Sequence, residues 1–220
     1  NPQNLQPVEW VALEAAQRTI ARLGSRRLKT RRVPVLFTPE VARGLIGHFL
    51  AAIRGGNLYR KSSFLLDHLN KPVFSKQIHI SEKPHVPVGL ASAPFDDEGV
   101  VTKQRDLVAA GILEGYILNS YSARKLGMQT TGNAGGVHNI FVDTSHYDYP
   151  ALLKLMGTGL IVNEVMGQGV NIVTGDYSRG AAGFWVENGE IQYPVNEITI
   201  AGNLRDMFMH IIAIGKDIDT

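Results

Sequence analysis

The Asn188-Gly189 pair constrains the fold of this chain more than any other feature, because it predicts a β-hairpin. A two-residue type I′ turn needs positive φ at both central positions, and Asn and Gly tolerate that conformation best. The residues on both sides of the pair are rich in aromatic and β-branched types, as strands are. Because side chains alternate along a strand, we expect Phe184 and Val186 on one face and Trp185 on the other.

Apolar spacing in Pro7–Leu23, and residues typical of helix starts and ends elsewhere, predict four long helices. These expected helices are Pro7–Leu23, Thr38–Ile53, Ala151–Met166 and Leu204–Ile214. A short helical piece is also expected near Ser63–Leu69, within an otherwise loop-rich stretch. The chain therefore combines helices with at least one hairpin.

Composition limits the classes of protein to which this chain can belong. With 220 residues, of which 44% are hydrophobic, the chain can bury a core in one domain or in two small ones. The formal net charge of +2 provides no global field for nucleic acid or membrane. The lack of Cys excludes disulfides and thiolate chemistry, and it fits a reducing compartment. No apolar run reaches the roughly 20 residues of a membrane helix. Since the sequence begins without Met, we expect a fragment of a longer, soluble, intracellular protein.

A basic cluster follows the first expected helix. It could contact phosphate or nucleic acid, or it could be a solvated connection to the next strand. We favour the connection, because no aromatic residues are interleaved with the charges. The cluster consists of Arg26, Arg27, Lys29, Arg31 and Arg32.

Acidic and histidine residues offer candidates for acid–base or metal chemistry. A self-sufficient hydrolase would have to draw on Asp96, Asp97, Glu98, His138 or His146. The three acids also suit an ordinary turn, and the spacing of His68, His79 and His85 matches no metal motif. The polar loop 130–138 could bind an anion through its amides, but it lacks the strand and helix that frame phosphate motifs. These residues alone therefore establish no site.

The expected helix Thr38–Ile53 contains two glycines, Gly44 and Gly47, each of which costs about 1 kcal/mol relative to Ala. Such a cost calls for close packing or for a site that has been lost. His48 follows directly, and a single histidine on a helix is more often an interior residue than a ligand.

Six segments carry recognisable motifs, at 62–67, 130–136, 166–170, 174–180, 184–191 and 199–204. Together they closely resemble the C-terminal region of the TldD/PmbA family, in its PmbA (TldE) branch. This family has been described as modulators of DNA gyrase and classed as peptidases. The resemblance covers essentially the whole chain, as one C-terminal domain over 1–220 with an N-terminal helix in 1–24. Because family members are about twice this length, the N-terminal half looks absent.

The resemblance implies an α+β fold with a large, mostly antiparallel β-sheet and packed helices. It also implies a cytoplasmic metalloprotease complex that acts on unstructured polypeptides and in peptide maturation. In that complex the TldD-type subunit carries zinc on a helix-borne His-Glu-x-x-x-His motif.

Aligned by the resemblance, that zinc motif falls on Arg43, Gly44 and His48, of which only His48 keeps a ligand type. Catalytic zinc needs about three protein ligands and a base. The resemblance therefore implies an accessory subunit with no catalytic or metal-binding residues, whose zinc lies in the TldD-type partner. We expect contacts with the partner or with unfolded peptide at Arg43 and His48, and at Tyr177 and Arg179 before the hairpin. No membrane association is expected, and self-association is possible where the partner is absent. A self-sufficient hydrolase and a gyrase- or nucleic-acid-binding module stay as alternatives.

Overall fold

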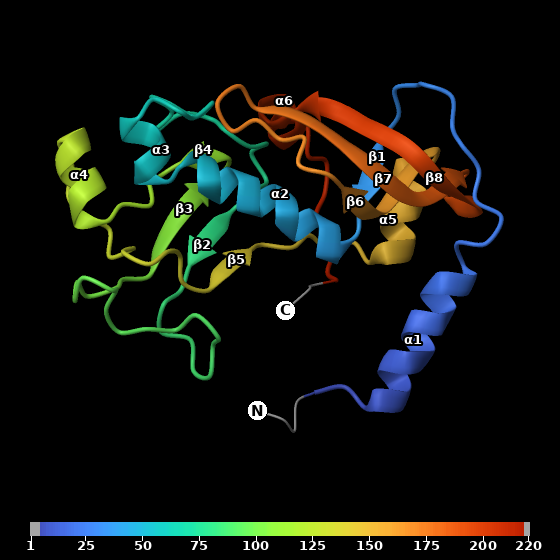
Figure 1. The fold of residues 1–220 in the computed structure, drawn as a ribbon, viewed down its shortest axis with the longest axis horizontal. Helices are drawn as coiled ribbons and strands as arrows, with labels where there is room; N and C mark the ends of the chain where they lie inside the picture. Colours follow the sequence, from blue (N-terminus) through green and yellow to red (C-terminus); the bar gives the residue numbers. More distant parts are fainter. Residues whose placement is uncertain (1–4, 218–220) are drawn as a thin grey trace.

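The hairpin lies in the first of two four-stranded sheets (Figure 1). In a computed structural model that describes residues 5–217, this sheet has the order β1-β6-β7-β8, with β1 parallel to β6 and the other pairs antiparallel. Its strands are β1 (Val35–Phe37), β6 (Gly159–Met166), β7 (Asp176–Glu187) and β8 (Glu190–Asn203).

The second sheet is antiparallel throughout and has the order β4-β3-β2-β5. Its strands are β2 (Ile80–Glu82), β3 (Arg105–Ala109), β4 (Ile112–Leu113) and β5 (Ile140–Val142). The α+β class and the mostly antiparallel pairing are therefore confirmed, but the strands divide between two sheets and do not form one large sheet.

The hairpin prediction is confirmed in detail. Asn188 and Gly189 have φ of 53° and 77°, and β7 pairs with β8 on both sides of them. Phe184 and Val186 join a small core with Leu153 of the helix Tyr149–Met156, whereas Trp185 joins a different core on the opposite face. The alternation along β7 thus gives this sheet two buried faces.

Six helices are present in residues 5–217. Figure 1 shows α2 crossing the middle of the molecule between the two sheets, and α5 beside β1 and β6. Val41, near the start of α2, belongs to the core of the first sheet, and Phe49, further along, belongs to the core of the second. This helix therefore joins the two halves of the fold. The helices are α1 (Val8–Ile20), α2 (Pro39–Ala52), α3 (Gly55–Tyr59), α4 (Ser120–Leu126), α5 (Tyr149–Met156) and α6 (Leu204–Met209).

The predicted helix Ala151–Met166 is wrong in its second half. Helix α5 ends at Met156, Gly157 takes φ of 66°, and the chain continues as strand β6. Residues 160–162 are buried because β6 lies between β1 and β7 and both faces of the sheet are covered. Such a strand has a continuous apolar run that periodicity cannot distinguish from a buried helix.

Two other predicted helices are also corrected. Residues 63–69 form turns and no helix: the Ser63 hydroxyl donates to the Ala52 carbonyl and accepts from the Leu65 amide, and Asp67 has φ of 55°. Helix α6 ends at Met209, well before Ile214. Beyond it the Ile211 carbonyl accepts hydrogen bonds from the Ser75 hydroxyl and the Gln77 amide, which hold the chain extended.

Helix α1 stands apart from the rest of the molecule in Figure 1, and none of its residues is buried. Trp10 is 50% exposed and Ile20 is 65% exposed. Two ion pairs join it to the rest of the molecule: Arg18 pairs with Glu40 at 3.0 Å, and Arg22, just after the helix, pairs with Glu164. None of the described helices is both long and apolar enough to cross a membrane.

Candidate functional site

Helix α2 and strand β7 bring together three of the residues singled out in the sequence. The rings of His48 and Tyr177 meet edge to face, with their centroids 6.2 Å apart. Tyr177 and Arg179 are two positions apart on β7 and so point to the same side of the strand. Arg179 also donates to the Met166 carbonyl at 3.4 Å. The site therefore joins an imidazole, a phenol and a guanidinium from distant parts of the chain.

Burial and the Arg179 charge determine the protonation of this group. Burial lowers the pKa of His48, and the positive charge of Arg179 lowers it further. Burial raises the pKa of Tyr177, with Arg179 acting in the opposite direction. Both changes favour neutral forms at pH 7: an uncharged imidazole and a protonated phenol. Tyr177 is only 2% exposed, and its hydroxyl forms no hydrogen bond within residues 5–217.

Close packing does not explain the two glycines of α2. A Cβ added at Gly44 or Gly47 would meet no atom of residues 5–217 within 4 Å. Arg43, on the same helix, is exposed. Within the described part of the chain, the helix therefore leaves open space beside Gly44 and Gly47.

The donor set at this site does not fit a zinc ion. Catalytic zinc is held by histidine, cysteine or carboxylate ligands, whereas His48 has a phenol and a cation as its neighbours. Across residues 5–217 no cluster of three His, Cys, Asp or Glu side chains is arranged to hold a metal. The group around His48 therefore offers zinc a single ligand of the usual type.

The three acidic residues proposed for acid–base chemistry form hydrogen bonds or contacts within and beside a turn. Asp96 is 5% exposed, and its carboxylate accepts hydrogen bonds from the Glu98, Val100 and Ala134 amides. Burial raises the pKa of Asp96, but these amides outweigh burial, so the pKa lies below its ordinary value. Glu98 accepts from the Ser120 amide at 2.9 Å, and Asp97 lies beside Gly135.

The histidine candidates are dispersed. His138 contacts the carbonyls of Ala91 and Gly132, and the His146 ring lies against Tyr147. The remaining three have separate polar partners. These are the Leu66 carbonyl for His68, Asp106 for His79 and Thr102 for His85.

A buried polar network that sequence reasoning missed holds the loop 130–138. Glu82 is 1% exposed and accepts from Arg105 at 2.8 Å, from the Asn133 amide at 2.7 Å and from the His138 backbone at 2.8 Å. Arg105 also donates to the Tyr116 carbonyl and to Asn133. The loop is thus anchored to β2 and β3 by its side chains. The sequence signal for this network is a polar Asn within a glycine-rich loop.

The basic cluster packs on the hairpin. Arg26 lies over the Tyr193 ring at 4.7 Å, Arg31 lies over the Trp185 ring at 4.8 Å, and Arg27 pairs with Glu197. Backbone hydrogen bonds join Arg26 to Pro194 and Asn196 of β8. At least three of the five charges therefore attach the segment to the sheet.

Comparisons with known proteins agree with this architecture. The profile of a family described as the PmbA/TldA metallopeptidase C-terminal domain matches residues 30–220. The metalloprotease PmbA of Escherichia coli is 57% identical over 99% of this chain and 48% of its own length. A PmbA homolog of Haemophilus influenzae is 58% identical over 98% of this chain and 48% of its own length. The chain thus spans about half the length of these curated relatives.

Solved structures share the fold. The crystal structure of a putative modulator of DNA gyrase from Thermotoga maritima superposes with a TM-score of 0.91, at 35% identity, over 99% of this chain and 52% of that one. TldE from Thermococcus kodakarensis has a TM-score of 0.84 at 24% identity, over 96% of this chain and 50% of that one, and shows the fold alone.

Proposed function

Because the chain belongs to the PmbA/TldA metallopeptidase C-terminal domain family, we propose that it serves as the zinc-free part of a two-subunit protease. In this proposal a TldD-type subunit supplies the zinc, and the present chain completes the assembly that receives unstructured polypeptide in the cytoplasm. Its contribution is to bind partner or peptide, and it performs no chemistry alone.

The surroundings of His48 carry this proposal. A zinc ion would need His48 together with two further ligands, yet Tyr177 and Arg179 stand beside it. The permanent positive charge of Arg179 repels a divalent cation and cannot act as a base. The same groups suit a polypeptide, because a phenol and a guanidinium donate hydrogen bonds to carbonyl and carboxylate oxygens. The open space at Gly44 and Gly47 lies on the same helix.

The two alternatives have weaker support. A self-sufficient hydrolase would need its acids free to act, but the Asp96 carboxylate is committed to three backbone amides. A nucleic-acid-binding module would need its basic segment free, but Arg26 and Arg31 lie on aromatic rings and Arg27 is paired with Glu197.

The test is bound zinc and peptidase activity on an unfolded polypeptide. We would measure both for this chain, for a version extended to the length of the curated relatives, for the TldD-type subunit, and for each mixture. Zinc in the TldD-type subunit, with full activity only in a mixture, is the expected result. Stoichiometric zinc and turnover in this chain alone would overturn the proposal. The extended version separates failure to assemble from an incorrect assignment.

Arg179→Gln and His48→Gln are the informative variants of the active mixture. Both are expected to raise the KM for polypeptide, because the groups contact substrate or partner. Glu190→Gln, at the far end of the hairpin, serves as the exposed control. Unchanged assembly and kinetics in both site variants would count against this location of the contact.

A further inference from the structure

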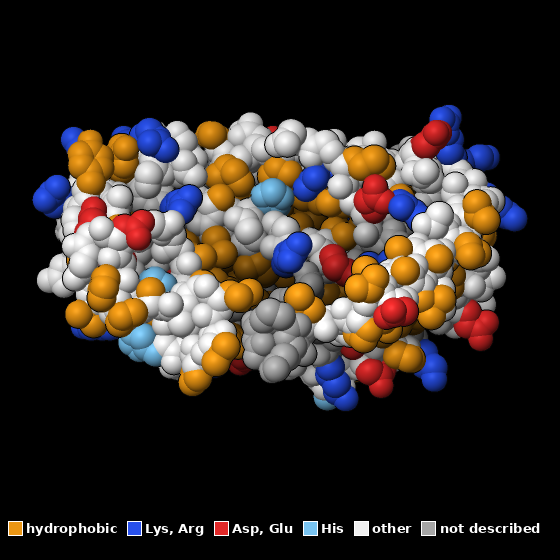
Figure 2. Space-filling view, turned by 60° about the horizontal axis from the view of Figure 1, so that its bottom comes forward, with side chains coloured by type: hydrophobic (Ala, Val, Ile, Leu, Met, Phe, Trp, Pro, Cys, Tyr) orange, Lys and Arg blue, Asp and Glu red, His pale blue; other side chains and the backbone are white. Residues whose placement is uncertain are grey.

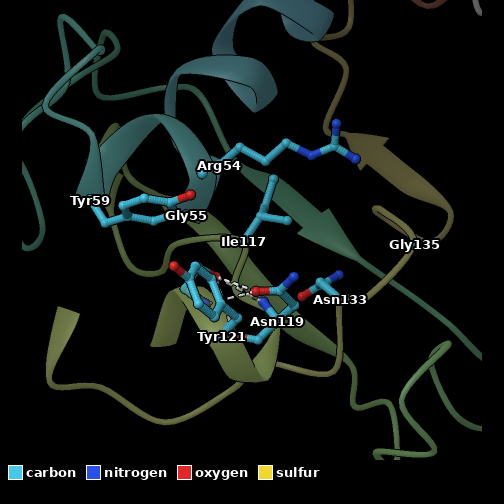
Figure 3. A pocket seen from close by; sticks show the side chains of 10 residues that line it. Arg54, Gly55, Tyr59, Ile117, Asn119, Tyr121, Asn133 and Gly135 are labelled. Carbon is cyan, nitrogen blue, oxygen red and sulfur yellow. Dashed lines mark hydrogen bonds between the residues drawn. The ribbon is translucent and has the colours of Figure 1, made fainter. Parts of the chain in front are cut away.

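A second site lies away from His48, in a pocket of about 260 Å³ at the junction of α3, α4 and the loop 130–138 (Figure 3). Its lining includes Arg54, Tyr59, Asn119, Tyr121 and Asn133. In Figure 3 the Tyr59 and Tyr121 rings stand on one side, and the Arg54 side chain crosses the other side toward Gly135. This volume lies just below the roughly 300–1,000 Å³ of pockets for drug-sized ligands, so it suits a smaller group, such as the last residue of a peptide.

The pocket offers hydrogen-bond donors that residues 5–217 leave without an acceptor. Arg54 is exposed, and within the described residues its guanidinium has no hydrogen bond or ion pair. The Asn119 side chain accepts from Ser122 through its oxygen, whereas its amide nitrogen has no partner in residues 5–217. The Tyr121 hydroxyl is likewise unbonded within that range. A ligand here would therefore be an acceptor.

The local charge points to an anion. No carboxylate of residues 5–217 lines the pocket. Two further cations flank its aromatic side: Arg60 lies 5.4 Å from the Tyr59 ring centroid, and Lys125 lies 5.7 Å from that of Tyr121. The acids nearby lie outside the lining, where Glu98 is bonded to the Ser120 amide and Asp97 lies beside Gly135. Arginine binds carboxylates through two parallel hydrogen bonds, which suits a planar anion.

The aromatic side adds a preference for a flat or apolar group. The Tyr59 and Tyr121 rings meet edge to face with centroids 5.7 Å apart, and Tyr121 is 50% exposed. Beneath them, Gly55 packs so tightly that a Cβ would lie 2.4 Å from the Ser122 hydroxyl. The backbone around the pocket is thus fixed, whereas the ring surfaces are available for stacking.

We propose that this pocket binds the C-terminal carboxylate of a peptide, with Arg54 holding the carboxylate and Tyr59 and Tyr121 contacting the last side chain. The inference goes beyond the proposed function and does not depend on it, because binding is measured on this chain without a partner.

The test compares two short acetylated peptides that end in Phe, one with a free carboxylate and one amidated, by titration calorimetry. The free acid is expected to bind with one-to-one stoichiometry and at least about tenfold more tightly than the amide. A third peptide, amidated and carrying an internal Glu, separates the two sources of a carboxylate. Equal binding of acid and amide, equal binding of the Glu peptide, or no saturable binding at millimolar peptide would each overturn the assignment.

Variants locate the binding site. Arg54→Gln is expected to weaken binding of the free acid about tenfold. Arg54→Lys is expected to weaken it less, because lysine keeps the charge but cannot form two parallel hydrogen bonds with a carboxylate. Tyr121→Ala is expected to reduce the preference for Phe over Ala at the last position. Arg124→Gln removes the same charge from α4 outside the pocket and is expected to leave affinity unchanged. Native circular dichroism of each variant establishes folding, and wild-type affinity in Arg54→Gln would contradict the proposal.

Discussion

The Nε atom of Arg105 donates to the Glu82 carboxylate at 2.8 Å, and the Glu82 side chain is 1% exposed. This buried pair, completed by Asn133, joins the second sheet to the loop 130–138. Breaking one partner of a buried ion pair leaves the other charge uncompensated, which costs more than the pair contributes.

Glu82→Gln is therefore expected to lower the free energy of unfolding by about 3 kcal/mol. The neutral amide of Gln leaves the Arg105 charge unbalanced. Its NH₂ group also replaces a carboxylate oxygen that accepts a hydrogen bond, so that two donors face each other. Urea denaturation followed by fluorescence measures the change. The exposed Glu190→Gln serves as the control, and a difference between the two variants below roughly 0.5 kcal/mol would contradict the role of the network.

The hairpin turn gives a second prediction. Gly189 has φ of 77°, and a Cβ there would lie 3.1 Å from the Lys154 Cα, whereas Gly24 has φ of 72° with open space around it. Both Gly→Ala substitutions introduce backbone strain of about 1 kcal/mol. Gly189→Ala is expected to cost measurably more, because the hairpin packs against α5. Equal unfolding free energies for the two variants would show that the contact with α5 contributes nothing.

The glycines of α2 give a prediction of the opposite sign. Gly44→Ala and Gly47→Ala are each expected to raise the free energy of unfolding by about 1 kcal/mol, because alanine favours the helix and nothing stands in the way of its methyl group. Gly55→Ala is the matched contrast and is expected to destabilise, since its Cβ would collide with Ser122. Thermal melts of the three variants check both signs.

The lowered pKa of His48 makes stability depend on pH. Because the unfolded state binds a proton more readily than the folded state, stability attributable to His48 is present above its ordinary pKa of about 6.5 and is lost as pH falls through the lowered pKa. His48→Gln is expected to lose less stability than wild type between pH 7 and pH 5. The control is His146→Gln, and parallel pH profiles for His48→Gln and wild type would rule out this contribution.

Nuclear magnetic resonance resolves the cause of the His48 shift. Burial is the larger cause and the Arg179 charge the smaller one, so Arg179→Gln is expected to raise the pKa of His48 only part of the way to its ordinary value. Complete recovery would mean that charge, and not burial, dominates.

Local rules predicted the parts of the fold that depend on local conformation. The turn at Asn188-Gly189 follows from the φ angles that these two residues tolerate, and α2 follows from its period and its early Pro39. The prediction of a helix across β6 was wrong because both faces of this strand are buried, which removes the alternation of apolar and polar residues. Helix α6 was overextended because the polar contacts that end it come from Ser75 and Gln77, far away in sequence.

The candidate site was less predictable. The sequence singled out His48 on one segment and Tyr177 and Arg179 on another, but only the packing of α2 against β7 brings them into contact. The pocket at Arg54 gave no signal, because its residues come from three segments without any motif. Figure 2 shows hydrophobic side chains exposed on several parts of one face, and no sequence pattern predicted where they gather.

The isolated position of α1 makes its docking sensitive to ionic strength. The helix is tied to the body by Arg18–Glu40 and Arg22–Glu164, both of which are solvent-exposed pairs. Added salt screens such pairs, and a free helix of 13 residues is marginal in water. Rising salt should therefore release and unwind this segment while both sheets stay intact. The N-terminal helix should then melt in a salt-dependent transition separate from that of the core.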